Sequence, residues 1–172
     1  IADGVDNGPI VDQMSTEILM TDTAQTVDQK ILRLYEEIIT RNLSALENGT
    51  AKSTPQNEAD ATYTCKRTPE DGEINWQAAA TQIHNLIRGL SHPFPGAYTQ
   101  LKGKLVQIWG SEIPVESLNY VGNIPGRIIG KRDGKIEVLT GKGVIQLTQL
   151  QFAGEPVKDA KEVSVSVKDT FG

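Results

Sequence analysis

The chain has 172 residues, of which 38% are hydrophobic and 23% charged, so it can bury a core and has the composition of a soluble globular protein. Its one cysteine, Cys65, excludes an internal disulfide framework, and two histidines at no metal-ligand spacing argue against a metal site. No apolar run approaches the roughly 20 residues of a membrane-spanning helix, and no signal peptide pattern occurs. We therefore expect a cytoplasmic protein without a membrane partner, and the missing initiator Met leads us to expect a piece of a longer chain.

The first segment, IADGVDNGPIVDQ, holds Asp6 between Gly4 and Gly8, with Pro9 directly after. Glycine permits a tight turn and proline restricts its exit, so the pattern predicts a turn that presents a carboxylate. Local turn chemistry alone also explains such a pattern, so a plain surface turn stays open. The following PIVDQMSTEIL predicts a strand.

A long helix is predicted after Asp22, which offers an N-cap with Gln25 three residues later. Gly49 is placed to end it. Its apolar residues form two adjacent stripes, which predicts a broad buried face. The stripes contain Val27, Ile31, Leu34 and Ile38 on one side and Tyr35, Ile39, Leu43 and Leu46 on the other. A strand followed by this helix indicates the closing part of an α/β unit.

A polar stretch with Pro55 follows and predicts a linker. Asn75 is then a candidate cap for a second helix, which the HPFPG turn would end. From Ala97 onward the apolar pattern has period two, in five short runs separated by glycine-bearing turns. The runs are AYTQL, KLVQIWG, GRIIGK, KIEVLT and VIQLTQLQF. They predict a small barrel or sandwich, for instance an oligonucleotide-binding (OB) type barrel.

Charge is unevenly distributed along the chain, whose net charge is −5. Residues 101–172 carry ten basic and eight acidic side chains, and the first hundred residues carry the remaining excess of acid. This permits a polyanionic partner for the C-terminal part without requiring one. His84 and Arg88, four residues apart, form no recognised catalytic pair, and neither a phosphate-binding loop nor a Gly-x-Ser-x-Gly motif occurs.

Three separated stretches together resemble the formyltransferase family that uses 10-formyltetrahydrofolate. They are, in order, DGVDNGPIVDQ, ATYTCKRTPEDGEINW and IHNLIRGLSHPFPGAYTQLKGKLVQIW. The first is similar to the loop that follows the family's folate-binding fold, and the others to the segments leading into its C-terminal domain. The resemblance implies an α/β plus β architecture. It would comprise the end of a Rossmann-like formyltransferase domain (1–50), a linker (51–74), and a C-terminal helix plus OB-like β-barrel domain (75–172).

The resemblance also implies a role for Asp6. Family members use an Asn, a His and an Asp, and Asp6 corresponds to that Asp. The loop Gly4, Val5, Asp6 would lie against the pterin of the formyl donor, 10-formyltetrahydrofolate, with no metal involved. The Asn and His would lie upstream of this chain, so residues 1–172 alone are expected to be inactive.

The acceptor stays open between two classes. Methionyl-tRNA formyltransferases are the commonest members with this domain order, which favours initiator methionyl-tRNA. RTPEDGEINW and PFPGA look at least as much like enzymes that formylate nucleotide-linked amino sugars, and Glu155 and Pro156 stand where tRNA enzymes often carry a basic stretch. A non-catalytic binding module is the third reading. If tRNA binds, the candidate contacts are Arg127, Lys131, Arg132, Lys135 and Lys142.

Overall fold

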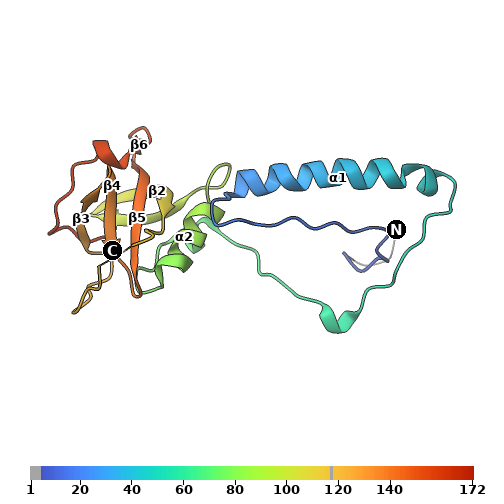
Figure 1. Ribbon diagram of the computed structural model, residues 1–172, viewed down its shortest axis with the longest axis horizontal. Helices are drawn as coiled ribbons and strands as arrows, with labels where there is room; N and C mark the ends of the chain where they lie inside the picture. Colours follow the sequence, from blue (N-terminus) through green and yellow to red (C-terminus); the bar gives the residue numbers. More distant parts are fainter. Residues whose placement is uncertain (1–4, 117) are drawn as a thin grey trace. The chain divides into compact units, whose positions relative to one another are not determined.

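The computed structural model describes residues 5–116 and 118–172, and the chain divides into two compact units (Figure 1). The N-terminal unit runs to Asp22 and continues over Thr26–Lys66. The C-terminal unit comprises Thr23–Gln25 and Arg67–Gly172. Each unit is described separately below.

The N-terminal unit is built on one long helix, α1 (Ala24–Glu47), which confirms the predicted helix. Gly49, with φ of +67°, follows the helix end, where the amide of Thr50 donates to the carbonyl of Ala45. No residue of α1 is fully buried, so the predicted broad buried face is not seen here. The first predicted stripe, from Val27 to Ile38, is half-buried, and the second, from Tyr35 to Leu46, is exposed. The large apolar side chains of α1 on the surface are Leu32, Tyr35, Ile39, Leu43 and Leu46.

The strand predicted from PIVDQMSTEIL is wrong for this structure. That stretch forms one isolated antiparallel bridge, between Ile10 and Thr54, and is otherwise irregular. A strand is stable only when neighbouring strands satisfy its backbone groups, and no described residue supplies a continuous partner. The α/β character of this part is therefore not visible in the described residues.

The C-terminal unit consists of one helix on an antiparallel sheet. Its elements are α2 (Ala80–Gly89), β1 (Ala97–Leu101), β2 (Lys104–Glu112), β3 (Ile128–Arg132), β4 (Lys135–Leu139), β5 (Val144–Phe152), β6 (Lys158–Asp159), and two 3-10 turns, η2 (Pro69–Gly72) and η3 (Ala160–Glu162). The strand order is β1-β2-β5-β4-β3, with β6 paired to β5. All five predicted strand runs are confirmed, whereas β6, only two residues long, has no sequence signal.

The predicted OB-type barrel is not confirmed, because the edge strands β1 and β3 do not pair with each other. Instead, the last residues of the chain lie between these edges. Phe171 bridges Leu101 at the end of β1, and Thr170 bridges Arg127 just before β3. The amide of Phe171 donates to the carbonyl of Gly126 at 2.9 Å, so this segment satisfies backbone groups that an open sheet would leave unpaired.

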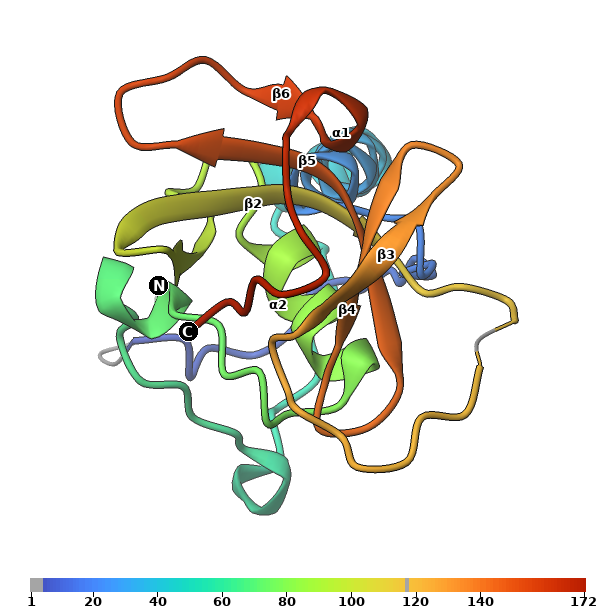
Figure 2. The same ribbon diagram turned by 90° about the vertical axis from the view of Figure 1, so that its left-hand side faces the viewer.

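Helix α2 packs against β2 and β5 (Figure 2). It buries Ala80, Ile83 and Ile87 because these residues recur on one face of the helix. Asn75 is not its cap, since α2 begins at Ala80. Asn75 instead accepts the amide of Gln77 in the preceding turn, and the Gln82 side chain accepts the amide of Ala79 at the helix start. Among the described residues, no helix combines the length and apolarity needed to cross a membrane.

Candidate functional site

The candidate catalytic carboxylate, Asp6, lies in a turn with left-handed backbone. Its φ is +59°, a region that non-glycine residues rarely adopt and that Asp and Asn tolerate best. Such conformations persist where the surroundings hold them, and they cluster at functional sites. Asp6 and Val5 are exposed, Val5 with 92% of its surface accessible. Gly4, the remaining residue of the predicted folate-binding loop, lies outside the described residues.

The Asp6 turn borders an open groove of about 840 Å³ within the N-terminal unit. One wall is the segment that contains Asp6 and Ile10, and the other is the predicted linker around Gln56 and Tyr63. This volume lies in the range of small-molecule sites. The groove therefore has the size for a ligand and places a carboxylate beside apolar side chains.

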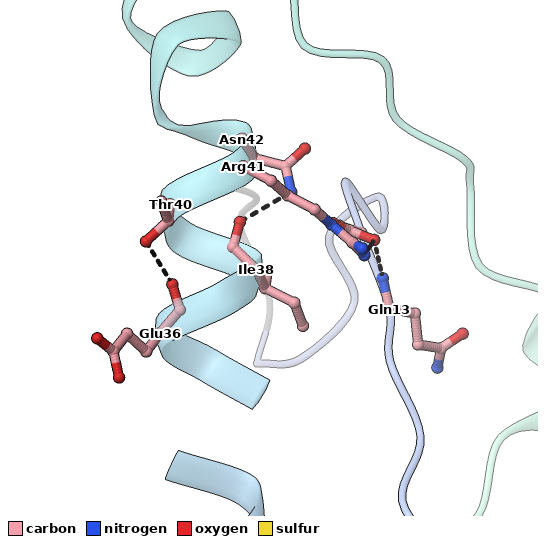
Figure 3. Close-up of polar contacts among 7 residues, drawn as sticks. Gln13, Glu36, Ile38, Thr40, Arg41 and Asn42 are labelled. Carbon is pink, nitrogen blue, oxygen red and sulfur yellow. Dashed lines mark hydrogen bonds and ion pairs between the residues drawn. The ribbon is translucent and has the colours of Figure 1, made fainter. Parts of the chain in front are cut away.

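Asp12 fastens the segment after this turn to α1. Figure 3 labels its partners on the helix, Arg41 and Asn42, and the next residue of the segment, Gln13. Both carboxylate oxygens of Asp12 accept from the Arg41 guanidinium, at 2.6 Å each, and one also accepts from the Asn42 amide. The Arg41 and Asn42 hydrogen bonds hold the pKa of Asp12 well below its usual range. A bidentate pair fixes geometry as well as charge, so the path of the chain between the Asp6 turn and α1 is defined.

Asp22 anchors the start of α1. Its carboxylate accepts the Lys30 ammonium, the amide of Leu19 at 2.7 Å and the hydroxyl of Thr26 at 2.9 Å. The Lys30 hydrogen bond is the largest cause that lowers the pKa of Asp22 to about 2. The amide of Leu19 contributes next. Asp22 thus ties the first turns of α1 to the segment that precedes the helix.

Changing Lys30 to Met should raise the pKa of Asp22 toward its ordinary value of about 3.8. Because the folded-state pKa is depressed, Asp22 stabilises the helix start fully above pH 4 and loses this effect as the pH falls toward 2. Carboxyl carbon NMR titration of the 172-residue chain measures the shift. Lys52→Met, which changes an exposed lysine of the same unit, should leave the Asp22 titration in place; an unmoved Asp22 pKa in Lys30→Met contradicts the assignment.

The five basic residues predicted to contact tRNA fall at two ends of the β3–β4 hairpin. Lys131, Arg132 and Lys135 lie at its turn, whereas Arg127 precedes β3 and Lys142 follows β4 at the opposite end. Lys131 donates to the carbonyl of Val163, and Lys135 pairs with Glu112. Arg132 lies 3.4 Å from Glu137, and Arg127 donates to Thr170 at 2.7 Å. The described residues place no ion pair on Lys142. Three of the five residues lie at one end of the hairpin and two at the other, so they are not gathered at one place.

Both histidines have structural partners in the C-terminal unit. The Nδ1 atom of buried His84 lies 2.9 Å from the Ser111 hydroxyl. The ring of His92 stacks on Trp109, with centroids 4.0 Å apart, a contact that no sequence pattern indicates. Within residues 5–116 and 118–172, no group of three His, Cys, Asp or Glu residues is arranged to hold a metal ion.

Comparison with known proteins identifies this architecture. Residues 66–166 match the family described as the formyl transferase C-terminal domain. The chain belongs to this family. The predicted family is thereby confirmed, although the matched region does not include the first of the three stretches. The small antiparallel sheet with its helix is the family's C-terminal domain.

Two curated relatives of this chain are methionyl-tRNA formyltransferases. The one from Agathobacter rectalis is 35% identical over 159 residues, covering 91% of this chain and 49% of the relative. The one from Blochmanniella pennsylvanica is 27% identical over 172 residues, covering 98% and 53%. The chain therefore spans about half the length of the curated relatives it matches.

Solved structures share the fold of this chain. HypX from Aquifex aeolicus in complex with tetrahydrofolic acid matches with a TM-score of 0.68 and 19% identity, over 92% of this chain and 28% of HypX. WlaRD, a sugar 3N-formyl transferase in the presence of dTDP and 5-N-formyl-THF, matches with a TM-score of 0.63 and 21% identity, over 91% of this chain and 53% of WlaRD. At these identities the likeness concerns the fold alone.

Proposed function

We propose that the protein to which this chain belongs transfers a formyl group from 10-formyltetrahydrofolate to the amino group of methionyl-tRNA. The observation that carries this proposal is family membership together with the Agathobacter rectalis methionyl-tRNA formyltransferase, 35% identical over 91% of the chain. HypX and WlaRD, whose solved structures contain tetrahydrofolic acid and 5-N-formyl-THF, support a folate formyl donor. A cytoplasmic location is part of the same proposal.

In this proposal Asp6 acts at the reacting centre. The acceptor amine attacks the formyl carbon, a tetrahedral oxyanion develops, and the amine gives up a proton. The bond between the formyl carbon and the folate nitrogen then breaks, that nitrogen takes up a proton, and tetrahydrofolate leaves. Asp6 would orient the catalytic His implied by the resemblance and help to move the proton from the amine. The family's His and Asn, which would stabilise the oxyanion, have no counterpart assigned among residues 1–172 in this proposal. The exposed Val5 and the groove beside Asp6 supply apolar surface where a pterin ring would lie.

A nucleotide-linked amino sugar is the second candidate acceptor. The observation that favours it is the electrostatics of the C-terminal unit, where four of the five candidate tRNA contacts already have protein partners. Surfaces that bind nucleic acid are expected to be distinctly basic. A sugar nucleotide is small enough to be bound near Asp6 without such a surface, and WlaRD is a sugar formyl transferase of the same fold.

An acceptor screen with the complete protein and 10-formyltetrahydrofolate decides between these functions. We expect formylation of initiator methionyl-tRNA and none of dTDP-linked amino sugars, measured as formylated product. Turnover of an amino sugar with methionyl-tRNA inert would replace the first proposal by the second. Folate binding without turnover of either acceptor would indicate a binding module.

Salt dependence tests whether the C-terminal unit contacts tRNA. Each neutralised phosphate contributes about one unit to the slope of log affinity against log salt. Lys142→Ala should reduce that slope by up to about one unit and raise the KM for methionyl-tRNA. Lys168→Ala, which changes another exposed lysine, is the matched control. An unchanged slope for Lys142→Ala would remove this residue from the tRNA-binding surface.

A further inference from the structure

The turn that carries Asp6 is held by a side chain about fifty residues later in the sequence. The Nε2 atom of Gln56 donates to the carbonyl oxygens of Asp6 and Gly8, each at 2.8 Å. These two carbonyls flank Asn7 and belong to the turn itself. A primary amide has two N–H groups on one nitrogen, so Gln56 uses its complete donor capacity on this turn.

A second attachment lies directly beside the first. Ile10 and Thr54 exchange two backbone hydrogen bonds of 2.8 Å, each amide donating to the other residue's carbonyl. The segment 54–56 therefore fixes the exit of the turn through its backbone and the turn itself through the Gln56 amide. The sequence predicts this segment as a linker, yet its contacts lie on the candidate catalytic loop.

We call these contacts of Gln56 and Thr54 with the Asp6 turn the clamp. The backbone conformation of Asp6 explains why the clamp matters. A left-handed φ of +59° is one of several conformations open to an exposed Asp in a turn flanked by glycines. All residues of the clamp are at least partly exposed, so its hydrogen bonds compete with water and add little to overall stability. Their effect is to select one conformation of the turn. This fixes the backbone position from which the Asp6 side chain projects.

We propose that Gln56 is a positioning residue for formyl transfer: its amide holds the Asp6 turn in the conformation from which the carboxylate acts. This inference rests on the proposed function. It deepens that function because it assigns a role in the reaction to segment 54–56 of the N-terminal unit, which the sequence predicts as part of a linker. The reaction rate falls steeply when a catalytic group is displaced, because the reaction needs that group in a near-attack geometry.

Two substitutions in the complete protein test the proposal. Gln56→Ala removes both donors and should lower kcat about tenfold or more, with a smaller change in the KM for 10-formyltetrahydrofolate. Gln56→Glu keeps the shape but places a charged acceptor against two carbonyl oxygens, so at pH 7.5 it should be at least as impaired. A kcat for Gln56→Ala equal to that of the wild type, in active protein, overturns the proposal.

The pH profile separates positioning from a merely structural effect. The carboxyl introduced by Gln56→Glu can donate one hydrogen bond when it is protonated. A carboxyl that faces carbonyl oxygens has its pKa raised above the ordinary value of about 4.3. The ratio of Gln56→Glu to wild-type activity should therefore rise as the pH falls from 7.5 to 5.5. The ratio of Gln56→Ala to wild-type activity should stay constant over the same range. If the ratio for Gln56→Glu is also constant, the hydrogen bonds from residue 56 do not position the turn.

Hydrogen exchange gives a readout that does not depend on activity. Exchange at the Ile10 and Thr54 amides should be several-fold faster in Gln56→Ala than in wild type, because the loop samples open states more often. Gln29→Ala, an exposed glutamine on α1, is the matched control and should change neither exchange nor kcat. If the wild type formylates no acceptor, the proposed function fails. The exchange rates of the Ile10 and Thr54 amides then test the clamp alone. Unchanged rates in Gln56→Ala would show that Gln56 does not hold the turn.

Discussion

Replacing Asp6 by Asn in the complete protein is expected to lower kcat for formyl transfer by about two orders of magnitude, the usual scale of a general acid–base contribution. The substitution keeps the size of the side chain and removes its charge. Asn also tolerates left-handed backbone, so the turn with φ of +59° should survive. The loss should therefore appear in kcat, while binding of the folate donor weakens less.

The measurement is steady-state formylation of the acceptor identified in the screen, with donor binding followed separately by titration. Asp28→Asn on α1 removes another exposed carboxylate, far along the sequence from the turn, and is the matched control. Wild-type turnover by Asp6→Asn would show that Asp6 is only a turn residue. If Asp28→Asn lowers kcat and donor affinity as much as Asp6→Asn does, the effect comes from the change in net charge and not from Asp6.

The local sequence pattern was sufficient to predict most of the strands and turns of the C-terminal unit. The five strands follow apolar runs of period two, and their turns have signals of their own, as in Asp133-Gly134 between β3 and β4, where both residues have positive φ. The strand expected after Pro9 failed because a strand depends on a partner, and the sequence pattern does not say whether one is present. The OB-type closure is not confirmed, and the sequence pattern could not decide it because edge pairing is a long-range property.

The candidate site was predictable only in part. Asp6 is a candidate because of its glycine-flanked turn and a family resemblance, and the structure adds the left-handed backbone and the groove. Gln56 could not be found, because an isolated polar side chain in a polar segment has no pattern, and its partners lie about fifty residues earlier. Lys131 shows the converse problem: clustered positive charge suggests a ligand, but its ammonium donates to a backbone carbonyl of Val163.

The second large expected effect concerns Phe171, which lies between the two open edges of the sheet. Its side chain is 2% exposed and stacks on Trp76, with ring centroids 5.2 Å apart. Phe171→Ala should lower the free energy of unfolding of the C-terminal unit by about 3–5 kcal/mol, the range for losing a buried aromatic side chain. Phe94→Ala, at a phenylalanine with 49% exposure, is the matched control and should cost about 1 kcal/mol or less.

Tryptophan fluorescence during urea unfolding of the 172-residue chain makes this measurement specific. Both tryptophans of the chain, Trp76 and Trp109, lie in the C-terminal unit, so the transition reports on that unit even if the N-terminal unit unfolds separately. Phe171→Leu retains most of the apolar volume and should recover part of the loss. A loss below 1 kcal/mol for Phe171→Ala would show that the sheet does not depend on this segment.

Hydrogen exchange then separates two ways in which the Phe171 ring can stabilise the unit. If the ring acts only by filling space, the hydrogen bond from the amide of residue 171 to Gly126 should persist in Phe171→Ala. Exchange at that amide should then accelerate only as far as the global stability falls. A larger acceleration there than at the amides of β5 would mean that the ring also holds the terminal segment against the edges at β1 and β3, because only local opening exposes one amide ahead of the rest.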